Sequence, residues 1–230
     1  MAKNKLPSKE EMVVRSFQIP DIRAQALTEG EGEGNVIEGH PAVYDQKVAI
    51  GNWFYEIIER GAFDNTDFDD VLFTVNHDWY DKIPLARSRR NNKSNKKSTM
   101  EIKTDDIGLF VRANLDVERN SEAQNLYSAV ERGDIDGMSF AFYVKEETWE
   151  DLDSDMPTRR IKKISKVREV SAVNYPAYEA TDINARNDQM ALENAKKALD
   201  NARSSLENGK SEIEALKLRS QILMKMESEI

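Results

Sequence analysis

The stretch GDIDGMSFAFYV, Gly133 to Val144, ends a polar run with a glycine and continues as an apolar segment with one hydroxyl, that of Ser139. Its aromatic and branched residues predict a buried strand over Ser139–Trp149. In an extended strand Ser139, Ala141 and Tyr143 share one face, and the apolar residues that alternate with them share the other. The small residues leave room for a substrate or for a side chain from a neighbouring strand. Ser139 is therefore a candidate for chemistry, although serine is also common in ordinary sheets.

Other segments have the same strand character, and one has the pattern of a helix. A helix is expected over Asn120–Asp134, with Asn120 or Ser121 as its N-cap and Gly133 as its C-terminal stop. Together these elements predict a mostly β chain with interspersed helices, an α+β fold. Strands are expected over Val71–Trp79, Ile107–Val117 and Lys166–Tyr178.

Composition limits the function. The chain has 230 residues, of which 39% are hydrophobic, enough for one domain with a real core and an appendage. The formal net charge of −9 disfavours nucleic acid as a partner, because phosphates repel an acidic surface. The absence of cysteine excludes disulfides, thiolate metal sites and thiol nucleophiles. No segment has the apolar run of a signal peptide or a membrane span, so we expect no membrane partner and an intracellular location.

The last 45 residues differ from the rest. Residues 186–230 contain no proline and no aromatic residue, and their charges balance. A heptad pattern predicts either a helix that packs on its own domain or, as we favour, a coiled coil or partner-binding helix; Gly209 could also divide it into a helical hairpin. The heptad positions are Leu192, Leu199, Leu206 and Ile213, with Ala195, Ala202, Leu216 and Leu223 at the offset of three.

A basic segment, RSRRNNKSNKK, covers Arg87 to Lys97 and contains no apolar residue. A solvated loop explains it without any function. A contact with an acidic partner, or a protease-sensitive site, is the alternative.

A serine nucleophile at neutral pH needs a base that titrates near pH 7, and the chain has two histidines. His40 lies beside a proline in EGHPAVYDQ. His77 is better placed, because it lies at the polar end of an expected strand, where a rigid scaffold meets an accessible rim. A histidine at a strand end is still more often structural than catalytic.

Four blocks of the sequence follow one another in order between Phe54 and Thr181. They read FYEIIERGAFDNTDFDDVLFTVNHD, DDIGLFVRANLD, LYSAVERGDIDGMSFAFYV and REVSAVNYPAYEAT, and the stretch IEGHPAVYD precedes them. No block is decisive alone, but their order and spacing are specific jointly. Taken together, the blocks resemble the prohead serine protease family of tailed bacteriophages, and IEGHPAVYD is similar to the family's opening strand.

The resemblance implies a catalytic set. It identifies His77 as the general base, Ser139 as the nucleophile and Glu169 as the acid that orients the imidazole. Glu169 shares its strand face with Ser171 and with apolar residues, so its carboxylate must find a partner. A structural pair of Glu169 with an arginine, Arg168 or Arg112, is the alternative, and Asp78 ranks lower as the third member.

The resemblance also implies a fold and partners. We expect a herpesvirus-protease-like antiparallel β-barrel surrounded by helices, with residues 1–12 as a flexible tail, 13–185 as the protease domain and 186–230 as a helical or coiled-coil tail. The expected substrates are the major capsid protein and the scaffold, inside the assembling procapsid in the cytoplasm of a bacterial host. Self-cleavage is plausible in the basic segment, near residues 184–189 and at the N-terminus. No cofactor or metal is expected, and a homo-oligomer, a dimer or larger, is expected through the helical tail.

Two other functions remain open. One is a noncatalytic assembly protein that acts through its C-terminal helix. The other is a metal-dependent hydrolase, although adjacent acids on a strand face opposite sides and cannot both chelate without a bend. Its ligands would be Asp69, Asp70, Asp105 and Asp106.

Overall fold

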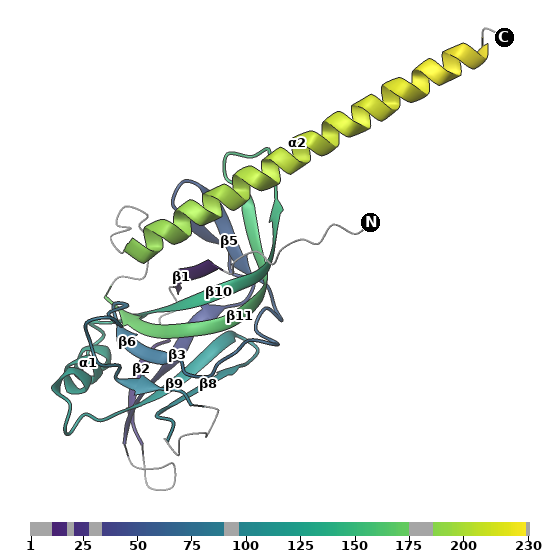
Figure 1. The fold of residues 1–230 in the computed structure, drawn as a ribbon. Coiled ribbons are helices and arrows are strands. Elements are labelled where there is room, and N and C mark those ends of the chain that lie inside the picture. The colour runs from purple at the N-terminus through teal and green to yellow at the C-terminus, as the bar shows by residue number, and fades with distance from the viewer. Residues whose placement is uncertain (1–10, 18–20, 28–33, 90–96, 175–185, 229–230) are drawn as a thin grey trace.

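The computed structural model describes residues 11–17, 21–27, 34–89, 97–174 and 186–228 (Figure 1). Strands dominate these residues, and the helices are few, so the fold is of the α+β class. In chain order the elements are β1 (Glu11–Phe17), β2 (Arg23–Ala26), β3 (Asn35–Val43), β4 (Val48–Ile50), β5 (Phe54–Ile58), β6 (Leu72–Val75), β7 (Ala86–Arg87), β8 (Met100–Thr104), β9 (Gly108–Leu115), α1 (Ser121–Glu131), β10 (Gly137–Glu150), β11 (Thr158–Val173) and α2 (Arg186–Ser228).

The strands pair into two sheets. The larger has the order β1-β10-β11-β5-β4, with β6 also paired to β11 and β7 paired to β6. The smaller has the order β2-β3-β9-β8. These pairings do not themselves show a closed barrel among the described residues, so barrel closure stays a prediction.

The antiparallel hairpin of β10 and β11 is the centre of the larger sheet. Along one edge of β11, its first residues pair in parallel with β5 and its last residues pair in parallel with β6. Within the hairpin the register between β11 and β10 shifts by one residue. Ala141 lies opposite Glu169, while Phe142 lies opposite Val167. The extra residue, Arg168, is exposed and forms a bulge. This hairpin therefore carries β1 on one side and two shorter strands on the other.

The GMSFAF segment at the start of β10 is buried throughout. Phe140 and Phe142 stack at a centroid distance of 4.4 Å, and Phe140 also packs against Phe63. Each such buried ring stabilises the fold by roughly 1.5–3 kcal/mol. Because both faces of this segment are covered, the hydroxyl of Ser139 lies inside the protein and not on a solvated sheet face.

Most of the elements expected from the sequence are confirmed. Asn120 is the N-cap of α1, where its side chain accepts from the backbone amides of Glu122 and Ala123. After α1, Gly133 has a φ of 75°, a left-handed conformation that glycine adopts at little cost. The strands β9 and β10 closely match the expected segments, and β11 is longer at its N-terminal end; residues 175–178 of that expected strand lie outside the described residues.

One expected strand is wrong at its end. The segment Val71–Trp79 was predicted as continuous, but β6 covers only Leu72–Val75. Asn76 and His77 have φ values of 50° and 60°, which end the strand in a left-handed turn. Hydrophobic alternation does not reveal such a turn, because left-handed non-glycine residues depend on tertiary contacts.

The helix α2 is continuous through Gly209, so the helical-hairpin alternative is wrong. Its first part packs on the domain: Ala195 and Leu199 are buried, and Ala195 packs with Phe54. Further along, Arg203 donates to the backbone oxygens of the β10–β11 turn. Figure 1 shows the remainder projecting beyond the domain. No helix in the described parts of the chain is long and apolar enough to cross a bilayer.

The tail boundaries proposed from the sequence differ in places from the described elements. Residues 1–10 lie outside the described residues, while Glu11 and Met12 already belong to β1. At the other end, residues 175–185 lie outside them and α2 begins at Arg186.

His40 is a buried clamp in the smaller sheet. Its Nδ1 is hydrogen-bonded to Asp21, its Nε2 lies 2.9 Å from Oδ2 of Asp105, and its ring packs edge-on against Phe110. Burial lowers the pKa of His40, but the hydrogen bonds and negative charges of Asp105 and Asp21 outweigh burial and raise the pKa above 6.5. The imidazole thus ties β3 to the segment before β2 and to the β8–β9 turn.

We expect the pH-dependent part of the stability from His40 to be fully present below pH 6.5, the ordinary value, and lost as the pH rises through the raised pKa. The measurement is the free energy of unfolding in urea of the parent and of His40→Asn, between about pH 5.5 and about pH 9. The stability difference should shrink with rising pH. Arg23→Gln is the control, because its guanidinium stays charged over this range. A difference that is constant or grows with pH would contradict the clamp.

Candidate active site

The left-handed turn after β6 positions His77. The amide of Asn76 donates to the backbone oxygen of Ala172 at 2.9 Å, and the amide of His77 donates to Oγ of Ser171 at 2.9 Å. Both acceptors lie on β11, beside β6. The turn is therefore held by the neighbouring strand, and it directs the imidazole back over the sheet.

The imidazole of His77 contacts two of the expected site residues. Its Nδ1 lies 2.8 Å from Oε2 of Glu169, and its Nε2 lies 2.6 Å from Oγ of Ser139. With the carboxylate as acceptor, the proton belongs on Nδ1, and Nε2 faces the hydroxyl with its lone pair. Trp79 packs edge-on against the ring at a centroid distance of 5.9 Å.

Glu169 has no exposed surface, so its carboxylate depends on protein partners. Thr74 donates its hydroxyl proton to Oε1, while His77 contacts Oε2. The hydroxyl of Ser171 lies 3.0 Å from that of Thr74 and accepts from the amide of His77. One consistent direction runs through this ring: the His77 amide donates to Ser171, Ser171 to Thr74, and Thr74 to Glu169.

Strand register explains why these side chains meet. Ser139 lies opposite Ser171, and Ser171 lies opposite Thr74, so the three hydroxyl residues form a row across β10, β11 and β6. Glu169 lies two residues before Ser171 and shares its face. The row places the carboxylate and the hydroxyl of Ser139 within reach of one ring at the end of β6.

Ser139 has a second contact. Its hydroxyl donates to the backbone oxygen of Arg15 in β1 at 2.9 Å, and the residue has 0% exposure. A hydroxyl has one proton, so the Arg15 oxygen and Nε2 of His77 compete for it. The nucleophile candidate is therefore fully covered in this conformation.

A serine, a histidine and a buried acid in these contacts are suited to acyl transfer. The imidazole can take the hydroxyl proton, and the acid can hold the ring tautomer and stabilise the imidazolium. Ser139 lies on β10, Glu169 on β11 and His77 in the turn after β6, so the three residues are far apart in sequence.

The other candidates take different roles. His40 belongs to the clamp in the smaller sheet. The structural alternative for Glu169 is wrong, because Arg112 pairs with Glu38 and Arg168 is exposed at the bulge. Asp78 follows the turn, and its amide donates to the backbone oxygen of Val75.

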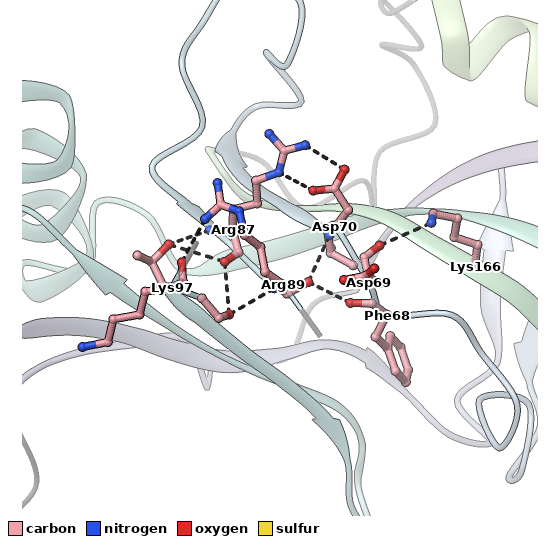
Figure 2. Close-up of polar contacts among 11 residues, drawn as sticks. Phe68, Asp69, Asp70, Arg87, Arg89, Lys97 and Lys166 are labelled. Carbon is pink, nitrogen blue, oxygen red and sulfur yellow. Dashed lines mark hydrogen bonds and ion pairs between the residues drawn. The ribbon is translucent and has the colours of Figure 1, made fainter. Parts of the chain in front are cut away.

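The acidic pairs have other partners. Figure 2 shows Arg87 directed at Asp70, with two hydrogen bonds of 2.6 and 2.7 Å, and Lys166 reaching the backbone oxygen of Asp69. The hydrogen bond and charge of Arg87 hold the pKa of Asp70 below its usual value. Asp105 contacts His40. In the parts of the chain that the structure describes, no group of three or more His, Cys, Asp or Glu is arranged to hold a metal ion.

The basic segment is tied at both of its described ends. Arg89 donates to the backbone oxygen of Lys97 at 3.0 Å (Figure 2). The amide of Thr99 donates to the backbone oxygen of Arg87. Residues 90–96 lie outside the described residues.

A cavity of about 400 Å³ adjoins the turn. Its lining includes Asn76 and Asp78 on either side of His77, together with Leu126 of α1. Ile83, also at its rim, is 82% exposed.

Sequence reasoning missed Thr74, Arg15 and the role of Ser171. The available signal was a pair of small hydroxyl residues within otherwise apolar strand segments, since such groups need partners when buried. No signal in the sequence pointed to Arg15, because its contact with Ser139 uses the backbone.

Comparisons with known proteins identify a family and similar proteins for this chain. A family model described as Caudovirus prohead serine protease matches residues 21–197. The chain is 28% identical over 171 residues to the prohead protease of Enterobacteria phage HK97, covering 73% of this chain and 67% of that protein. It also resembles the structure of the bacteriophage T4 capsid assembly protease with a TM-score of 0.43 and 14% identity, covering 72% of this chain and 98% of that one.

The matched range covers well over half of the chain and includes His77, Ser139 and Glu169, whereas β1 precedes it. The chain therefore belongs to the Caudovirus prohead serine protease family.

Proposed function

We propose that this chain is a serine endopeptidase that cleaves scaffold and major capsid protein during phage procapsid maturation, with Ser139 as nucleophile, His77 as general base and Glu169 as its orienting acid. The observation that carries the proposal is the position of the His77 ring, with Nε2 2.6 Å from Oγ of Ser139 and Nδ1 2.8 Å from the buried Glu169. Membership of the prohead protease family supports the same role.

The proposed reaction is acyl transfer. Nε2 of His77 removes the hydroxyl proton of Ser139, and Oγ attacks the scissile carbonyl carbon. As the peptide C–N bond breaks, the imidazolium gives its proton to the leaving amine. Water, deprotonated by the same imidazole, then hydrolyses the ester and restores the hydroxyl. Every proton moves through residues of this chain, so the proposal involves no cofactor.

The proposed setting is the interior of the assembling procapsid in a bacterial host. The relatives are named for prohead and capsid assembly, which supports capsid proteins as substrates. The herpesvirus-protease-like barrel belongs to the same proposal, as does self-cleavage.

Replacing the nucleophile is the direct test. We expect Ser139→Ala to lose cleavage of capsid protein, measured by fragment masses after incubation with the purified substrate, because no oxygen remains to form the ester. Ser165→Ala is the matched control, since Ser165 is a half-buried serine on β11 whose hydroxyl donates to the backbone of Tyr143. Equal cleavage by the parent and Ser139→Ala would leave the protease proposal without a nucleophile.

Removing the charge of Glu169 tests its role. We expect Glu169→Gln to lower kcat by about 10³–10⁴-fold with little change in KM, because an amide favours the wrong imidazole tautomer and does not stabilise the imidazolium. Steady-state cleavage of a peptide substrate measures this. Glu38→Gln removes a buried carboxylate in the other sheet and should keep kcat near the parent's. An unchanged kcat in Glu169→Gln would show that Glu169 is only structural.

A second candidate function is noncatalytic assembly through α2, favoured by the exposure of Ile213 and Leu216 on its projecting part. Self-association of this surface would also support the homo-oligomer, dimer or larger, that we propose for the protease. Both residues belong to the heptad pattern.

We expect Ile213→Lys with Leu216→Lys to shift the chain to monomer in sedimentation velocity, because charges at seam positions oppose helix pairing. The matched control is Asn208→Lys with Ser211→Lys, which adds the same charge at exposed positions off the seam. Equal association of both double variants would exclude this surface as the interface.

A further inference from the structure

The strand β1 covers the nucleophile candidate. It is the edge strand of the larger sheet, antiparallel to β10, with Ser16 opposite Ser139. The backbone oxygen of Arg15 lies 2.9 Å from Oγ of Ser139. A peptide that Ser139 could attack needs its carbonyl near this point, so β1 occupies the space that an extended substrate requires.

The side chain of Arg15 fills a buried acidic site. Its Nε and second terminal nitrogen bind the two oxygens of Glu56 at 2.5 and 3.0 Å, and Arg159 binds Glu56 from another side at 3.1 Å. Burial raises the pKa of Glu56, but the charges of Arg15 and Arg159 outweigh it and hold the pKa below the usual value. Glu147 pairs with Arg159, so the four charges balance.

Without Arg15 this cluster would hold two carboxylates and one guanidinium. A buried carboxylate that loses a partner is costly, and the site therefore favours another cation in the same place. The bidentate geometry suits arginine better than lysine. The same strand position thus combines a carbonyl at the nucleophile with a basic side chain at Glu56.

We infer that β1 is a resident blocking strand on the substrate edge of β10, and that the substrates which replace it are extended peptides with a basic residue at the Arg15 position, selected by Glu56 and cut on its carboxyl side. This inference rests on the proposed protease function.

The contact with Arg15 also keeps the hydroxyl proton of Ser139 from His77. While the hydroxyl of Ser139 donates to the Arg15 oxygen, it does not donate to Nε2 of His77, which the general-base step requires. The helix α2 lies next to β1. Activity then depends on the fraction of chains in which β1 has left the edge.

The first test measures access to Ser139 in the full chain. A fluorophosphonate, which forms an O–P bond with an active serine and releases fluoride, is followed by the mass of the Ser139 adduct. We expect Arg15→Ala to be labelled at least about tenfold faster than the parent, because β1 has lost its anchor. Arg23→Ala removes an exposed arginine paired with Glu38 and should label like the parent. Equal rates for the parent and Arg15→Ala would overturn the inference.

The second test measures selectivity with peptides of sequence Val-Val-X-Ser-Phe, in which X is Arg, Lys, Gln or Glu. We expect kcat/KM for X = Arg to exceed that for X = Gln by about a hundredfold, and the ratio to fall towards one in Glu56→Gln. A ratio reports selectivity even if this variant is less stable. Equal cleavage of the Arg and Glu peptides by the parent would overturn the role of Glu56.

A second variant covers a loss of folding, and two outcomes then separate this inference from the proposed function. If Arg15→Ala fails to fold, Arg15→Lys keeps the charge but loses the bidentate geometry, and it should still label faster than the parent. If peptides are cleaved but the parent and Arg15→Ala are labelled at equal rates, the protease proposal stands and the blocking role of β1 is overturned. Folded parent and variants that neither label at Ser139 nor cleave any peptide would overturn the protease itself.

Discussion

A fully buried carboxylate, that of Glu169, is the constraint on which the candidate site depends. Such a group is destabilising unless both oxygens find donors, and here Thr74 and His77 supply them. Asn76 and His77 adopt left-handed backbone conformations that cost of order 1–3 kcal/mol each. Hydrogen bonds to a charged group contribute about 1.5–3 kcal/mol, enough to offset much of that cost. The turn and the carboxylate therefore stabilise each other.

Two buried acids of the larger sheet, Glu169 and Glu56, differ in their partners. Glu169 is satisfied by a hydroxyl and an imidazole, whose proton can move, whereas Glu56 is satisfied by two guanidinium groups, whose protons cannot. An imidazole between an acid and a hydroxyl is suited to proton transfer. A carboxylate between guanidinium groups is suited to holding a fixed charge. The chemical difference between the partners thus separates reaction from recognition within one sheet.

The sequence predicted the class of fold and selected three residues that the structure places in contact, but it did not predict the geometry that joins them. Alternation located β9 and β10, and Asn120 marked the start of α1, because these signals are local. Ser139, His77 and Glu169 were selected by the resemblance of whole blocks, and the structure brings them into contact. The turn at His77 was mistaken for a strand, since its left-handed backbone is held by Ala172 and Ser171, almost a hundred positions away.

Long-range backbone contacts explain the remaining surprises. Nothing near Arg15 in sequence indicates that its carbonyl meets Ser139, because that contact depends on an edge pairing across 124 positions.

The heptad pattern in α2 is ambiguous for another reason, since one pattern serves two surfaces: Ala195 and Leu199 pack on the domain, while Ile213 and Leu216 are exposed.

The division of α2 into a packed part and a projecting part limits how a partner could act on the site. A helix that pairs only with the exposed seam leaves Ala195 and Leu199 in place, and so leaves α2 against β1. To uncover Ser139 through α2, a partner would also have to displace those buried residues and expose their apolar surface, at about 25 cal/mol for each Å². Recruitment through the projecting part and opening of the site are therefore separable steps, because they draw on different surfaces of one helix.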